Sequence, residues 1–146
     1  MSKYNIVELT IENGELIDFD EKRQMEQKGL QSCNVIYIYK NTNFQNIYIG
    51  QTTNFLENHK KFYLSNKEMF KLANFNQVLV IVSIYFHKSA LDDVENQLIE
   101  YFSKCNDIKL YSSNKENIVL DYIEQNKVKN EVVVPLLEIL ENQKNK

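Results

Sequence analysis

The sequence predicts a single α/β (α+β) domain in which a small central antiparallel sheet is flanked by helices. Three observations lead to this prediction. Strand-like segments flank an Asn-Gly pair near the N-terminus, and two more, rich in β-branched and aromatic residues, lie at 33–40 and 46–50. A near-continuous apolar run at 77–86 is typical of a strand covered on both faces. A long segment with helical periodicity follows at 89–104.

The N-terminal extension, residues 1–30, is predicted to form a hairpin and a helix. The hairpin joins KYNIVELTI to ELIDF through Asn13-Gly14, the strongest short turn signal between paired strands. The polar segment 20–30 has helical character and ends near Gly29.

The core is predicted to span residues 33–112. Its first two strands, CNVIYIYK and NIYIG, are joined by a loop of turn-forming polar residues. A helix follows over roughly 54–64, with Thr52 or Thr53 as its cap, and another lies around 67–72. The apolar run QVLVIVSIYF supplies the next strand.

The long helix is predicted to begin at Ser89 as its cap and to precede a short strand, IKLY. Residues 117–142 are expected to form two further helices, with Pro135 in the first turn of the last one. No repeat, linker or low-complexity segment divides the chain, so residues 1–146 are predicted to form one domain.

Size and composition narrow the class of protein. With 146 residues, 43% of them hydrophobic and 25% charged, the chain resembles one soluble globular domain. No apolar run approaches the roughly 20 residues of a membrane-spanning helix, and the N-terminus lacks the apolar core of a secretory signal. Cys33 and Cys105 have neither metal-ligand nor redox spacing, so reduced thiols are expected. These features predict a cytoplasmic protein without a membrane partner.

The charge of the chain argues against general nucleic-acid binding. The formal net charge is −3, whereas such proteins usually carry a basic patch or a high pI. Arg23 is the only arginine among 17 cationic residues. Arginine has the planar fork that suits phosphate, while lysine offers only a flexible point charge.

Glu95 occupies an unusual place in the long helix. At 100° per residue, it falls in the middle of an apolar stripe formed by Leu91, Val94, Leu98, Ile99 and Phe102. The opposite side, expected to face water, carries Asp92, Asp93, Asn96 and Glu100. A carboxylate seldom enters an apolar face unless it is paired, metal-bound or catalytic. The alternative is a glutamate that reaches water or bonds a nearby hydroxyl group.

Four segments together resemble the GIY-YIG nuclease domain. They are VIY at 35–37, YIG at 48–50 after ten intervening residues, a helix start reading TTNF, and the Glu95 helix reading VENQLIEYF. Valine replaces the first glycine of the motif, while Gly50 is kept at a tight strand exit, where a side chain would obstruct the site. FHKSALDDVENQLIEYF, KLYSSNKENI and the hairpin are similar to the version found at the head of certain bacterial ATPases of unknown function. The resemblance implies a GIY-YIG-like fold with an added N-terminal hairpin and C-terminal helices.

The resemblance also implies an endonuclease that hydrolyses DNA with Mg²⁺ or Mn²⁺ if it is active. Glu95 matches the metal-binding glutamate, Tyr37 the tyrosine that activates the attacking water, and Tyr48 the tyrosine that helps to organise it. Gly50 would line the phosphate-binding site. A protein partner such as a nucleic-acid-processing ATPase is also implied. By themselves the tyrosines are weaker evidence, since they alternate with isoleucines as in ordinary half-buried strands.

The resemblance fails at the catalytic arginine. Eight residues beyond Gly50, where the family keeps it, this chain has Asn58, and four residues later, where the family often has histidine, it has Phe62. An asparagine can donate a neutral hydrogen bond to phosphate but cannot balance its charge. Lys61, about 60° around the helix from Asn58, is the candidate substitute for phosphate binding. His59 is expected to pack in the core.

Three functions remain open. The first, which the missing cation and the acidic net charge favour, is a degenerate GIY-YIG domain serving as a binding or regulatory module linked to nucleic-acid processing. The second, favoured by Glu95, is an active endonuclease that uses Lys61 or a partner's residue as its cation. The third is a structural or oligomerisation domain with the helix VVVPLLEILE as its contact surface. The sequence leaves the oligomeric state open.

Overall fold

The computed structural model describes residues 3–17, 23, 33–112 and 121–144. A six-stranded sheet with strand order β2-β1-β5-β3-β4-β6 forms its centre. The strands are β1 (Tyr4–Glu12), β2 (Glu15–Leu16), β3 (Val35–Lys40), β4 (Asn46–Thr52), β5 (Gln77–Ser83) and β6 (Lys109–Leu110). Neighbouring strands are antiparallel except β4 and β6, which are parallel. The predicted mixed class with a largely antiparallel sheet is confirmed.

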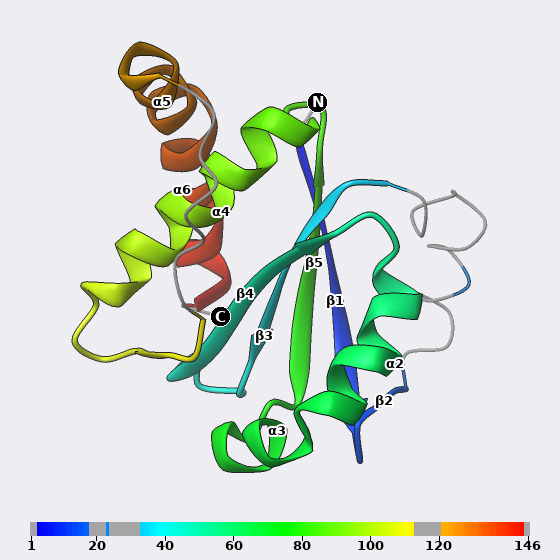
Figure 1. Ribbon diagram of the computed structural model, residues 1–146. Helices are drawn as coiled ribbons and strands as arrows, with labels where there is room; N and C mark the ends of the chain where they lie inside the picture. Colours follow the sequence, from blue (N-terminus) through cyan, green and yellow to red (C-terminus); the bar gives the residue numbers. More distant parts are fainter. Residues whose placement is uncertain (1–2, 18–22, 24–32, 113–120, 145–146) are drawn as a thin grey trace.

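Helices cover both faces of this sheet. They are α2 (Phe55–Ser65), α3 (Lys67–Ala73), α4 (Lys88–Ser103), α5 (Tyr122–Val128) and α6 (Val134–Lys144), with the π-helical segment η2 (Lys129–Val133) between the last two. Figure 1 shows α4 and α6 on one face and α2 and α3 on the other. Two hydrophobic layers result, because successive side chains of a strand point to opposite faces. On β3, Ile36 and Ile38 belong to the α4 layer, whereas Tyr37 and Tyr39 belong to the α2 layer.

The N-terminal hairpin turns where it was predicted to turn. Asn13 and Gly14 both have positive φ, 52° and 82°, as a two-residue type I′ turn requires. The longer strand, β1, also extends the main sheet by pairing with β5 from Tyr4 opposite Ser83 to Thr10 opposite Gln77. The helix predicted over 20–30 lies outside the described residues except for position 23.

Two predicted helix caps are wrong. Asn54 caps α2, because its side chain accepts a hydrogen bond from the Glu57 N–H at 3.2 Å. Thr52 instead accepts a bond from the backbone of Asn54 at 3.2 Å, which stabilises the turn leading into the helix. His87 is the cap of α4, so Ser89 lies inside that helix.

The two helices predicted in the C-terminal segment are α5 and α6, which the π-helical segment η2 joins into one continuous helical run. Within η2 the helix widens, and the Val134 N–H donates to the Lys129 carbonyl five residues back. Pro135 follows immediately, in the first turn of α6. A proline lacks the N–H for the carbonyl four residues earlier and its ring crowds that carbonyl, so a widened turn accommodates it.

The apolar face of this C-terminal run packs into the molecule. Leu136 and Leu140 have 0% and 1% of their surface exposed and belong to the hydrophobic layer under α4. An oligomer contact through the segment VVVPLLEILE therefore cannot use Leu136 or Leu140, since the chain itself buries them.

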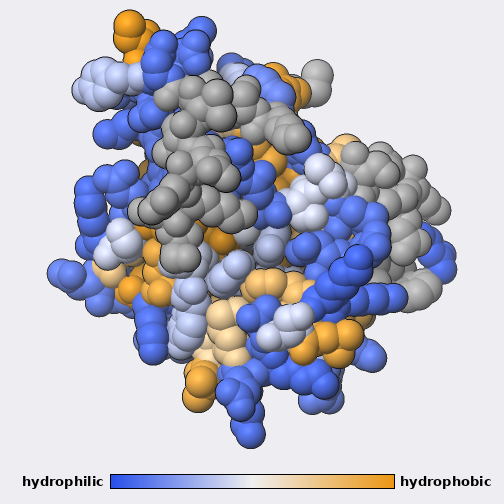
Figure 2. Space-filling view, in the orientation of Figure 1, coloured by the Kyte–Doolittle hydropathy of each residue, from blue (hydrophilic) through white to orange (hydrophobic). Residues whose placement is uncertain are grey.

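The surface shows hydrophobic residues dispersed among polar ones. In Figure 2 hydrophilic side chains predominate on the visible face, with smaller hydrophobic areas between them. The most exposed large hydrophobic residues are distributed over α2, α3, the segment after β5 and the start of α5, namely Leu64, Leu72, Ile84, Tyr122 and Ile123. Over the part of the chain that the structure describes, every helix is too short or too polar to cross a membrane.

Candidate functional site

Tyr37 and Tyr48 lie side by side on the α2 face of the sheet. Their rings are stacked with centroids 6.4 Å apart. Tyr37 pairs across the strands with Gly50, which lies within β4 and not at a strand exit. A Cβ atom on Gly50 would lie 2.4 Å from the Tyr37 hydroxyl oxygen. The absence of a side chain at Gly50 therefore makes room for the Tyr37 ring.

Gly50→Ala is expected to destabilise the protein by roughly 1–3 kcal/mol, because the Tyr37 ring is buried and must move to admit a methyl group. Urea unfolding measures the change. The same substitution is also made in a Tyr37→Ala protein, which has no ring for the added methyl group to meet. If Gly50→Ala is equally costly in both backgrounds, the close approach to Tyr37 is not the reason for the glycine.

Asn58 of α2 reaches the first of these tyrosines. Its Nδ2 donates a long hydrogen bond, 3.4 Å, to the Tyr37 hydroxyl oxygen. The side chain at the position that the resemblance assigns to an arginine thus points at the tyrosine pair and offers it a neutral amide.

The rest of the α2 face is aromatic. Phe62 packs on Tyr48, with ring centroids 4.7 Å apart, and stacks on Tyr39 at 5.4 Å. His59 is 3% exposed, as the prediction of a core histidine requires. Its Nε2 donates to the Gly14 carbonyl at 2.9 Å, since a carbonyl only accepts, and its Nδ1 lies 2.6 Å from the Tyr39 hydroxyl oxygen. His59 therefore joins the hairpin turn to the sheet.

Glu95 is completely buried in α4, at 0% exposure. The Gln51 Nε2 donates to Glu95 Oε2 at 3.0 Å and to Asp92 Oδ1 at 2.5 Å. Gln51 was missed in the sequence, although a signal existed. Strand alternation places it on the same face as Ile47 and Ile49, where a polar residue needs a polar partner.

The side of α4 predicted to face water is partly buried as well. Asp93 is 1% exposed and Asn96 is 6% exposed, so the prediction for these two residues is wrong. Asp92 shares the Gln51 amide with Glu95 and therefore lies on the Glu95 side of α4, not opposite it as predicted. The Gln97 Nε2 donates to Asp93 Oδ2 at 2.9 Å and to the Gln125 carbonyl at 3.0 Å. Burial raises the pKa of the Asp93 carboxyl, which the bond from Gln97 opposes. The C-terminal helical run covers this side.

The electrostatic surroundings disfavour ionised tyrosines. Burial raises the pKa of Tyr37, and the neighbouring Tyr48 and the Glu95 carboxylate raise it further, while the bond from Asn58 lowers it. Burial and then Glu95 likewise raise the pKa of Tyr48. The negative charge of Glu95 thus favours the protonated form of both tyrosines. Tyr37 stays protonated at neutral pH and is a poor proton acceptor.

Lys61 lies on the exposed surface of α2. Its Nζ forms an ion pair with Glu57 Oε1 at 3.3 Å, and both side chains are mostly solvent-exposed. The groups that shift the pKa values of Tyr37 and Tyr48 are neutral or acidic, namely Tyr48, Asn58 and Glu95.

The carboxylates beside Gln51 fit a divalent ion by their chemistry. Mg²⁺ and Mn²⁺ prefer oxygen ligands, and Mg²⁺ sites commonly combine one or two carboxylates with water and phosphate oxygens. Glu95 and Asp92 share one amide nitrogen and lie on the same side of α4. In the described ranges no cluster of three or more histidine, cysteine or acidic residues gathers, so water and phosphate would complete the shell.

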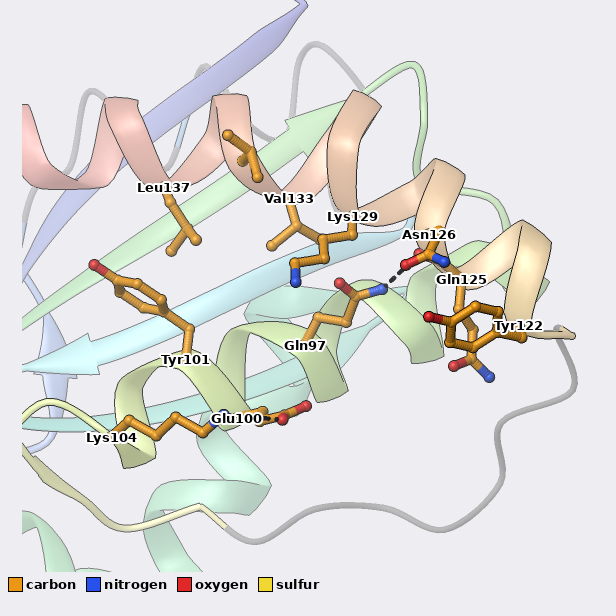
Figure 3. A pocket seen from close by; sticks show the side chains of 11 residues that line it. Gln97, Glu100, Tyr101, Lys104, Tyr122, Gln125, Asn126, Lys129, Val133 and Leu137 are labelled. Atoms are coloured by element: carbon orange, nitrogen blue, oxygen red, sulfur yellow. Dashed lines mark hydrogen bonds and ion pairs between the residues drawn. The ribbon is translucent and has the colours of Figure 1, made fainter.

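Two cavities lie away from these residues. One, of about 820 Å³, is bounded by the hairpin turn and α2, including Gly14 and Tyr63. The other, of about 290 Å³, separates α4 from the C-terminal run. Figure 3 shows its lining, in which α4 contributes Gln97 and Tyr101. Neither cavity is lined by Tyr37, Tyr48 or Glu95.

Comparison with known proteins gives one positive result. A family model described as the GIY-YIG catalytic domain matches residues 33–117. No curated protein and no solved structure matches the chain significantly. The matched segment runs from before β3 to beyond β6 and contains the tyrosine pair, Gly50, Asn58 and Glu95.

Proposed function

The chain belongs to the GIY-YIG catalytic domain family, and on that basis we propose that it is a nuclease-like domain with little or no remaining phosphodiester hydrolysis. It acts as a binding or regulatory module in nucleic-acid processing. DNA is the proposed ligand, and a nucleic-acid-processing ATPase is the proposed protein partner.

The observation that carries this proposal is the contact between Asn58 and Tyr37. A neutral amide lies 3.4 Å from the tyrosine hydroxyl oxygen, at the position that the resemblance assigns to the phosphate-binding arginine. Loss of one preorganised donor typically lowers the rate by about 10²–10³. Loss of a phosphate-clamping arginine costs roughly 10³–10⁵ in other phosphoryl-transfer enzymes.

The raised pKa of Tyr37 supports the same proposal. A tyrosine that accepts a proton from water works best when its pKa is near the working pH. Burial, Tyr48 and Glu95 all move the Tyr37 pKa in the opposite direction. If an ion is bound, Glu95 is the residue proposed to hold it, and the ion would stabilise charge on the phosphate and the leaving oxygen.

The active-enzyme alternative rests on a different observation. Glu95 is fully buried although desolvation of a carboxylate is costly, and a metal-binding or catalytic role would account for that cost. Lys61 would then supply the cation by leaving Glu57, and exposed ion pairs of this kind are weak.

Cleavage of supercoiled plasmid in the presence of Mn²⁺ tests the degenerate domain against the active enzyme. We expect the wild-type protein to nick plasmid no faster than Glu95→Gln, because both have a neutral asparagine at position 58 in place of the arginine that would stabilise the transition state. Both proteins are expected to bind DNA in a fluorescence-anisotropy assay, with affinity that falls as salt rises. Cleavage by wild type that Glu95→Gln abolishes would establish the active enzyme. Absence of DNA binding even at low salt would remove DNA as the ligand.

A further inference from the structure

We propose that Gln51 is a positioning residue for Glu95, holding the buried carboxylate in the orientation in which it binds a divalent cation. The inference rests on the proposed metal-binding role of Glu95. It adds a residue outside the motif positions that carry the family resemblance.

The hydrogen-bond geometry defines the role. Gln51 is the penultimate residue of β4, and its side chain reaches α4 across the sheet face. Carboxylates only accept, so the amide must turn its nitrogen toward Asp92 and Glu95, and that nitrogen carries two N–H groups. One serves Asp92 at 2.5 Å and the other serves Glu95 at 3.0 Å.

Asp92 acts as the anchor of this arrangement. It lies three residues before Glu95, so both carboxylates project from the same side of α4. With one N–H held by Asp92, the amide cannot rotate freely, and the second N–H selects one rotamer of Glu95. Hydrogen bonds of this kind orient metal-binding side chains, and their loss typically lowers metal affinity by about 10–100-fold.

The alternative to a positioning role is competition between the Gln51 amide and the cation. An amide nitrogen between two carboxylates presents its positive N–H ends where an ion could lie, and so could compete with the ion. The two possibilities predict opposite effects of the amide on cation affinity. A positioning amide strengthens cation binding, whereas a competing amide weakens it, so removal of the amide separates them.

The test is Mn²⁺ binding to the full chain, measured by calorimetry and by the electron paramagnetic resonance signal of free Mn²⁺. We expect wild type to bind Mn²⁺, Glu95→Gln to lose that site, and Gln51→Met to bind about 10–100-fold more weakly. Methionine keeps the length of the side chain and removes its donors.

Gln97→Met is the matched control. Gln97 also donates from its amide to a carboxylate, Asp93, and its side chain is directed from α4 toward the C-terminal run (Figure 3). Its substitution removes the same chemical group and is expected to leave Mn²⁺ affinity within about twofold of wild type, since it touches no proposed ligand. Thermal melting of the two variants shows whether their structural cost is comparable.

A second measurement needs no variant. In the wild-type protein, Mn²⁺ is expected to broaden the side-chain amide resonance of Gln51 at concentrations that leave that of Gln97 sharp. Equal broadening of both would overturn the proposal, as would unchanged or tighter Mn²⁺ binding by Gln51→Met.

A wild-type protein without a Glu95-dependent Mn²⁺ site would also overturn it. That result would leave the proposal of DNA binding without hydrolysis intact, because that proposal fails only on Glu95-dependent cleavage by wild type or on absence of DNA binding. Failure of the positioning role of Gln51 can therefore be distinguished from failure of the proposed function.

Discussion

Asn58→Arg is expected to raise Mn²⁺-dependent cleavage of supercoiled plasmid by at least about 10²-fold over wild type. Asn58 already points at the Tyr37 hydroxyl group, so a longer side chain from the same position reaches a phosphate placed beside the tyrosine pair. A guanidinium group would balance the phosphate charge. Its positive charge would also lower the pKa of Tyr37, which the Glu95 carboxylate raises. Gel separation of supercoiled, nicked and linear plasmid measures the gain.

Two controls make this result specific. Asn58→Arg combined with Glu95→Gln must be silent if the recovered cleavage uses the carboxylate. Lys60→Arg adds a guanidinium group to an exposed position of the same helix, about 160° from Asn58, and must also be silent. Cleavage by Lys60→Arg would indicate a general effect of added arginine, and silence of Asn58→Arg would show that the missing cation is not the principal defect.

Leu136→Ala is expected to lower the free energy of unfolding by about 2–5 kcal/mol. Leu136 is 0% exposed and packs in the hydrophobic layer between the sheet, α4 and the C-terminal run. Small domains are stable by only about 5–15 kcal/mol, so this loss is a large part of the total. Urea denaturation gives the free energy, and size-exclusion chromatography gives the oligomeric state.

Val134→Ala is the matched control for Leu136→Ala. Val134 lies on the same helix with 40% of its surface exposed, so its substitution is expected to change stability by less than about 0.5 kcal/mol. If Leu136→Ala kept full stability but dissociated an oligomer, the helix would be an intermolecular contact after all.

Local patterns in the sequence were sufficient for much of the fold. The positive φ angles of Asn13 and Gly14, the strands of alternating tyrosine and isoleucine, and the amphipathic long helix all follow from short-range chemistry. The spacing of Tyr37, Tyr48 and Glu95 was also sufficient to indicate the family, because a motif is a linear property of the chain.

Tertiary packing decided the remaining features. The Gln51–Glu95 hydrogen bond joins residues 44 positions apart, so periodicity in either segment alone could not show it. The second buried side of α4, with Asp93, exists because the C-terminal run docks there.

The sequence by itself therefore determined the fold class, the family and the uncharged side chain at position 58. The tertiary structure alone decided that this asparagine faces Tyr37, that Glu95 is held by an amide, and that Leu136 is buried within the chain. The physical reason is that turn chemistry and hydrophobic period depend on neighbouring residues, whereas burial and hydrogen-bond partners depend on which distant segments pack together.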